Sequence, residues 1–135
     1  MKTIILALAM TLSLNSFAKT VKKAMPASIY FENIKEGQTL ENGTIIKFGV
    51  KNMKLHPAGE IIPGTGHHHL IINGGPIPKG QMVIADATHI HFGKAQTETK
   101  LELPAGDYTL TLQFADGAHL SYGPELSSSV KVHVK

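Results

Sequence analysis

Histidine is the residue type in this chain with the clearest capacity for chemistry. Six of its eight histidines lie in three places: residues 67–69, residues 89–91 and the single His119. Residues i and i+2 of a strand lie on one face, about 6.5–7 Å apart, so two imidazoles at that spacing can converge on one ion. Neutral imidazole is the commonest protein ligand of Zn²⁺ and Cu²⁺. The two His-x-His spacings therefore predict a transition-metal site.

The metal hypothesis has a defined set of candidate ligands. Three or four imidazoles would give zinc or copper a tetrahedral or tetragonal site. The spacing leaves one choice open, because either His67 and His69 share a face or His68 points to the site alone. Asp86 and Glu98 can add a carboxylate or orient an imidazole. The candidate metal ligands are His67, His68, His69, His89, His91 and His119.

Other roles remain open for the same residues. A metal-free accessory module would use this surface to bind a protein or a small anion, and its histidines would serve structure or pH sensing. A copper/zinc redox enzyme of dismutase type is a further alternative, although the chain has no cysteine for the usual disulfide. We predict binding rather than catalysis. If a metal is bound, His89→Ala should abolish stoichiometric binding and lower thermal stability only when metal is present.

The elements that must position these residues are strands. Alternation with a period of two runs through residues 44–50, 97–103, 108–115 and 130–134, and no stretch has a convincing helical period. Residues 70–72 are apolar on both parities, which suits a strand covered on both faces. Glycine and proline punctuate the links. About seven short strands predict an all-β fold, an immunoglobulin-like antiparallel β-sandwich.

Two local features refine this fold. The segment Leu103-Pro104-Ala105-Gly106-Asp107-Tyr108 has the spacing of a tyrosine corner, in which the tyrosine bonds back across the preceding turn. The links over residues 51–66 and 73–88 are long, and long ordered loops in compact domains are often functional. We expect their apolar side chains to fold back onto the sheet: Ile61, Ile62, Ile77, Met82 and Val83.

The N-terminus has the features of a secretory signal. Lys2 is followed by an apolar run over residues 4–14 and by Ser16-Phe17-Ala18, which predicts a signal peptide over residues 1–18 that is cleaved after Ala18. Residues 19–135 then form a single domain. Export without cysteine favours a bacterial periplasm. We expect a metal ion and a periplasmic protein as partners, and neither nucleic acid nor membrane insertion after cleavage.

Several motifs together resemble one protein family. They are residues 65–72 with Gly66-His67-His68-His69-Leu70, residues 89–93, residues 96–99 and the corner at residues 103–106. This ordered set resembles the uncharacterised domain-of-unknown-function family forty-three ninety-nine, over roughly residues 29–134. That family has a second histidine near the last strand, whereas residues 118–122 here keep only His119. The resemblance implies an exported β-rich domain and no established reaction.

Overall fold

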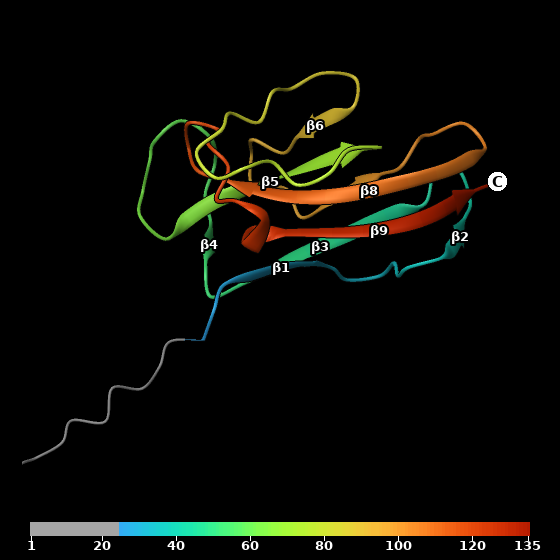
Figure 1. The fold of residues 1–135 in the computed structure, drawn as a ribbon, viewed down its shortest axis with the longest axis horizontal. Coiled ribbons are helices and arrows are strands. Elements are labelled where there is room, and N and C mark those ends of the chain that lie inside the picture. The colour runs from blue at the N-terminus through green and yellow to red at the C-terminus, as the bar shows by residue number, and fades with distance from the viewer. Residues whose placement is uncertain (1–24) are drawn as a thin grey trace, which may run out of the picture.

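The structure is a computed structural model that describes residues 25–135 (Figure 1). The predicted signal peptide lies outside the described residues. Within residues 25–135, no helix is long and apolar enough to cross a membrane. A short 3₁₀ turn, η1 (Pro124–Leu126), precedes the last strand. The strands are β1 (Ser28–Phe31), β2 (Gln38–Leu40), β3 (Ile45–Lys51), β4 (Lys54–Leu55), β5 (Thr65–Ile72), β6 (His89–His91), β7 (Glu98–Lys100), β8 (Gly106–Ala115) and β9 (Ser127–Val134).

Two sheets enclose an apolar core. One has the strand order β1-β3-β7, and the other has the order β2-β9-β8-β5-β4 with β6 also paired to β5. Most neighbours are antiparallel, while β2–β9 and β4–β5 are parallel. This arrangement confirms the predicted all-β sandwich. The described part of the chain has nine strands rather than about seven, because β2 and β4 are short pieces that the alternation did not resolve.

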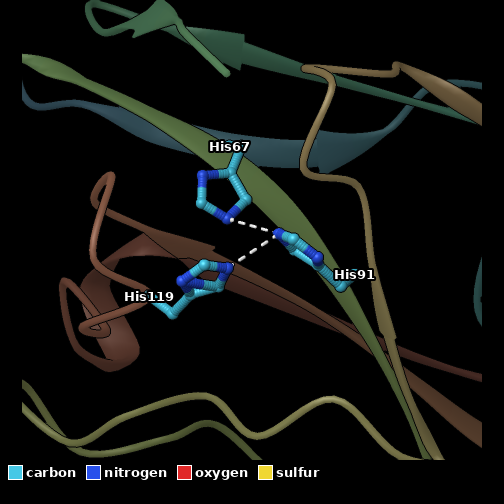
Figure 2. A group of neighbouring side chains, drawn as sticks. All are labelled: His67, His91 and His119. Carbon is cyan, nitrogen blue, oxygen red and sulfur yellow. Dashed lines mark hydrogen bonds between the residues drawn. The ribbon is translucent and has the colours of Figure 1, made fainter. Parts of the chain in front are cut away.

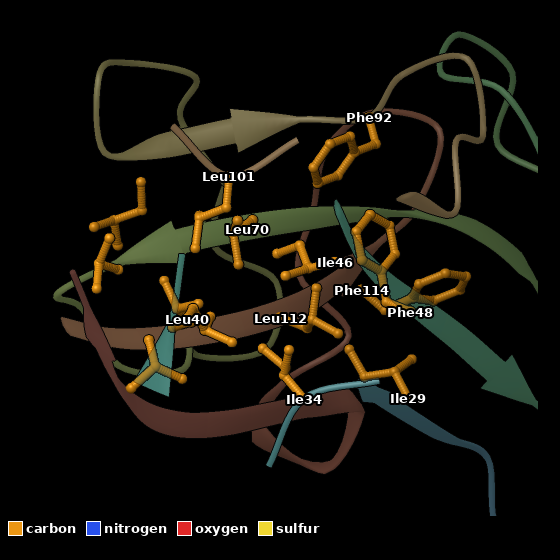
Figure 3. Close-up of a cluster of buried hydrophobic side chains, with 14 of the residues drawn as sticks. Ile29, Ile34, Leu40, Ile46, Phe48, Leu70, Phe92, Leu101, Leu112 and Phe114 are labelled. Atoms are coloured by element: carbon orange, nitrogen blue, oxygen red, sulfur yellow. The ribbon is translucent and has the colours of Figure 1, made fainter. Parts of the chain in front are cut away.

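The core lies between the two sheets. Ile46 and Phe48 of β3 meet Leu70, Leu112 and Phe114 of the larger sheet, and all five are fully buried (Figure 3). The corner before β8 closes one end of this core. There the Tyr108 hydroxyl donates a hydrogen bond of 2.9 Å to the Pro104 carbonyl, which confirms the predicted tyrosine corner.

Strand β5 is the element that positions the first histidine segment. It lies between β8 and β6, and all eight of its residues are buried. Its even-numbered residues, such as Leu70 and Ile72, join the core between the sheets. Successive side chains of a strand alternate between faces, so His67 and His69 share the opposite face, which resolves the choice that the sequence left open.

The two long loops, before β5 and before β6, fold back only in part. Val83 is buried, as expected, but Ile61 and Met82 are 59% and 62% exposed, so the fold-back prediction is wrong for those two side chains. For Met82 the reason is backbone pairing. Met82 bridges Leu120, and Val83 N–H donates to the His119 carbonyl at 2.8 Å. An extended segment held this way alternates its side chains, with Val83 directed inward and Met82 outward.

Candidate metal centre

In the described part of the chain, four histidine side chains meet on the outer face of β5. The Nε2 atoms of His67 and His69 are 3.0 Å apart, those of His67 and His91 are 3.2 Å apart, and those of His91 and His119 are 3.0 Å apart. Figure 2 shows the rings of His67, His91 and His119 pointing toward one another from three different segments. His67 and His69 are fully buried, and the other two are half-buried.

Strand pairing places His91 at this cluster. Strands β5 and β6 are antiparallel, and His91 lies directly opposite His69. Side chains of directly opposed residues lie on one face of the sheet, close together. Gly93 lies two residues after His91, and a Cβ atom there would overlap Cε1 of the His91 ring. The missing side chain at Gly93 therefore leaves room for the His91 ring to lie close to His67.

His119 reaches the cluster from a tightly folded loop. The Oδ1 atom of Asp116 accepts hydrogen bonds from the backbone N–H groups of Ala118 and Leu120, at 2.9 and 3.0 Å. Within this loop His119 has φ +67°, a left-handed conformation that is costly for residues other than glycine. A Cβ atom at Gly117 would overlap the Glu60 carbonyl oxygen, so the neighbouring loop packs directly on this turn. The strained conformation of His119 is thus held from both sides.

The contacts within the cluster exceed what neutral imidazoles can satisfy. Each Nε2 has one in-plane position, which carries either a proton or a lone pair. His67 Nε2 has two close neighbours, and so does His91 Nε2. No assignment of protons turns all three contacts into separate hydrogen bonds. A cation among these nitrogens would instead receive a lone pair from each ring.

Burial keeps the inner imidazoles in the form that binds metals. Desolvation lowers the pKa of His67 to about 4, and the nearby histidines His91 and His119 lower it as well. Desolvation also lowers the pKa of His69 to about 2, followed by repulsion from the neighbouring histidines. The pKa of His91 is lowered by burial and then by His119. The lone pairs of these three rings are therefore free at neutral pH.

These pKa shifts predict a stability loss in mild acid. We expect the free energy of unfolding of the metal-free protein to fall as the pH drops from 6.5 toward about 4, and to be unaffected by these groups above pH 6.5. The unfolded chain protonates its histidines in this range, whereas buried His67, His68 and His69 stay neutral, so the unfolded state binds more protons. Urea unfolding at a series of pH values measures the effect. A free energy of unfolding that stays constant across this range would contradict it.

Two of the six candidate ligands are not brought to the cluster. His68 lies on the core face of β5, where its ring packs edge-on against Phe48 and Phe114 at centroid distances of 4.9 and 5.1 Å. His89 lies opposite Ile71, two residues along the strands from the His69–His91 pair. Its Nδ1 donates to Asp86 Oδ1 at 2.9 Å. Metal ligation itself stays a prediction for all six histidines.

The carboxylates named from the sequence also lie elsewhere. Asp86 is bonded to His89, and Glu98 is exposed, 3.9 Å from Lys47. Sequence reasoning missed the two residues that shape the cluster, Gly93 and Asp116. The signals were an isolated glycine just after a strand and an Asp-Gly turn just before a histidine, both of which indicate unusual backbone or close approach.

Gly93→Ala is expected to damage the cluster without altering any ligand. The added methyl group would overlap the His91 ring, which must move away from His67. We expect about 10-fold weaker metal binding, as for changes that misplace a ligand. Isothermal titration with Zn²⁺ measures the loss. Gly75→Ala is the matched control, because a Cβ atom there meets nothing within 4 Å, and wild-type affinity in Gly93→Ala would contradict the prediction.

Comparison with known proteins adds a family and no activity. The family model described as Domain of unknown function (DUF4399) matches residues 46–135. The match confirms the resemblance seen in the sequence and spans every strand from β4 onward, with all six candidate histidines. No curated protein and no solved structure matches the chain.

Proposed function

Because this chain belongs to the DUF4399 family, whose description assigns no activity, we propose its function from the histidine cluster: the domain binds a transition-metal ion, zinc or copper. One observation carries the proposal. His67, His91 and His119 each offer a ring nitrogen within 4.8 Å of the other two. Three imidazoles at this spacing need only small movements to surround an ion at bond lengths of about 2.0–2.1 Å.

The surroundings of the cluster favour metal handling, in which the ion is taken up and released. His91 and His119 are half-buried, so an ion has a short path to solvent. Imidazoles that hold metals firmly donate their second N–H to an acceptor. The Nδ1 atoms of His67 and His69 are buried and have no such partner within residues 25–135. Metal binding through Nε2 would leave these two N–H groups unpaired, at a cost of about 1–3 kcal/mol each.

Elemental analysis tests the proposal directly. Untagged protein is purified without chelator, and zinc and copper are counted per chain before and after reconstitution. About one equivalent per chain supports a metal site. Less than about a tenth of an equivalent, unchanged by reconstitution, would refute it and leave the metal-free module.

The compartment is part of the same proposal. The features of residues 1–18 support export to the periplasm, where metal handling by an extracytoplasmic domain would take place. Cell fractionation followed by N-terminal sequencing tests this. Recovery of full-length protein that starts at Met1 in the cytoplasmic fraction would refute it.

One observation favours the metal-free module as a second candidate function. Ile61, Met82 and Ile84 are all more than half exposed, and Met82 pairs with Leu120, next to His119. Exposed apolar side chains beside a polar cluster are typical of surfaces that bind another protein. Under this hypothesis, charged substitutions at Met82 would abolish partner binding, and removal of metal would leave it unchanged.

A further inference from the structure

We infer that His69 completes the cluster as a fourth ligand, so that the ion lies in a closed tetrahedron of imidazoles that takes Zn²⁺ and leaves no position for a reacting water. This inference rests on the proposed metal-binding function and specifies its coordination. It separates a site that holds an ion from a site that activates water, because catalytic zinc sites keep one position open whereas closed sites have four protein ligands.

The position of His69 is the first support. Its side chain is fully buried on the same face of β5 as His67, and its Nε2 lies 3.0 Å from the His67 Nε2. Its Nδ1 has no hydrogen-bond partner within residues 25–135. The contact to His67 is therefore the one polar contact of this imidazole in the described part of the chain.

The arrangement of the four rings is the second support. The six centroid separations are 4.8 Å (His67–His69), 4.9 Å (His67–His91), 5.1 Å (His67–His119), 5.1 Å (His69–His91), 5.8 Å (His69–His119) and 4.4 Å (His91–His119). In a square arrangement the two diagonals, which share no ring, are about 1.4 times longer than the four sides. Here the longest separation joins His69 and His119. The separation between the other two rings, His67 and His91, is 4.9 Å and lies within the range of the remaining four. The pattern is that of a distorted tetrahedron.

Bond lengths agree with this geometry. A ring centroid lies about 3.2 Å from a zinc ion bound through Nε2, which gives about 5.2 Å between centroids in a regular tetrahedron. Four of the six separations lie within about 0.4 Å of that value. The other two both involve His119: its separation from His69 must shorten by about 0.6 Å from 5.8 Å, and its separation from His91 must lengthen by about 0.8 Å from 4.4 Å. His119 is half-buried and lies outside the named strands, so its ring can move by side-chain rotation while the backbone of its loop stays held.

The metal preference follows from the shape. Zn²⁺ has a filled d shell and accepts tetrahedral nitrogen ligands, whereas Cu²⁺ prefers a square or tetragonal arrangement. Two rings of this cluster come from the same face of β5, and a third comes from the paired strand β6. The backbone pairing of these strands therefore opposes a rearrangement of the four rings into a square. The geometry therefore selects Zn²⁺ over Cu²⁺ relative to an unconstrained set of imidazoles.

Cobalt substitution tests the inference, because Co²⁺ reports its coordination in its visible spectrum. Wild-type protein with one equivalent of Co²⁺ is expected to show the intense absorption of a tetrahedral ion, and added azide should leave it unchanged. His69→Ala is expected to bind Co²⁺ about 10–100-fold more weakly, and azide should alter its spectrum by entering the vacated position. His69→Gln serves as a second variant if His69→Ala fails to fold, and zinc X-ray absorption of the wild type counts the imidazoles independently.

The outcomes separate this inference from the proposed function. A wild-type protein that binds no Co²⁺ or Zn²⁺ refutes metal binding altogether. A wild-type protein that binds one equivalent but shows weak octahedral absorption, or whose spectrum responds to azide, refutes the closed tetrahedron alone. Unchanged affinity and spectrum in both His69 variants would likewise remove His69 from the ligand set while leaving the other three histidines as the site.

Discussion

Replacing His91 with alanine is expected to weaken Zn²⁺ binding by at least about 100-fold, the upper end of what even indirect disturbance of a ligand costs. His91 is the central member of the cluster, because its Nε2 lies within 3.2 Å of both His67 and His119. Without it, His119 keeps no contact at hydrogen-bond distance with another cluster nitrogen among residues 25–135. Isothermal titration with Zn²⁺ measures the change.

The same variant has a signature in thermal stability. A ligand that binds only the folded state at 100 times its dissociation constant stabilises that state by about 2.7 kcal/mol, and this gain should vanish in His91→Ala. The metal-free variant should unfold within about 0.5 kcal/mol of the metal-free wild type, because His91 is half-buried and lies outside the apolar core.

His89→Ala is the matched control for this prediction. His89 belongs to the same His-x-His segment of β6, but its ring is bonded to Asp86 and is not brought to the cluster. From the structure we therefore expect the large loss of zinc binding in His91→Ala, and not in His89→Ala, the variant chosen from the sequence. Loss of zinc binding in His89→Ala, with binding preserved in His91→Ala, would contradict the site described above.

His68→Leu is expected to stabilise the protein by about 1–2 kcal/mol and to leave metal binding unchanged. His68 is fully buried among Phe48 and Phe114, and neither ring nitrogen has a hydrogen-bond partner within residues 25–135. A buried polar atom without a partner costs about 1–3 kcal/mol, and leucine fills a similar volume without that cost. For a domain of this size, each kcal/mol raises the Tm by about 4 °C.

Urea unfolding of the metal-free proteins measures the gain. His68→Ala is the informative control, since it removes the same nitrogens but leaves a cavity between the two phenylalanine rings, and it should be less stable than wild type. A His68→Leu protein that loses stability together with zinc binding would show that His68 has a functional partner that the core position does not explain.

The fold was largely accessible from the sequence because its signals are local. Alternation of apolar residues marks each long strand, and the spacing from Pro104 to Tyr108 marks the corner that the structure contains. Short strands such as β4 were missed, since two residues carry no period. The exposure of Ile61 and Met82 was also missed, because hydrophobicity gives no information on which residues of an irregular loop face the sheet.

The sequence by itself determined the family, the all-β class and the set of histidines from which a metal site would be drawn. Only the tertiary structure decided which of them meet. Both faces of β5 are buried, and three consecutive histidines give no alternation of polar and apolar residues from which their faces could be predicted. The face on which His68 lies therefore depends on the packing of β5 against the core. The register of β6 places His91 rather than His89 opposite His69, and the turn at Asp116 brings in His119 from a distant segment. These are long-range pairings, and residue spacing along the chain does not encode them.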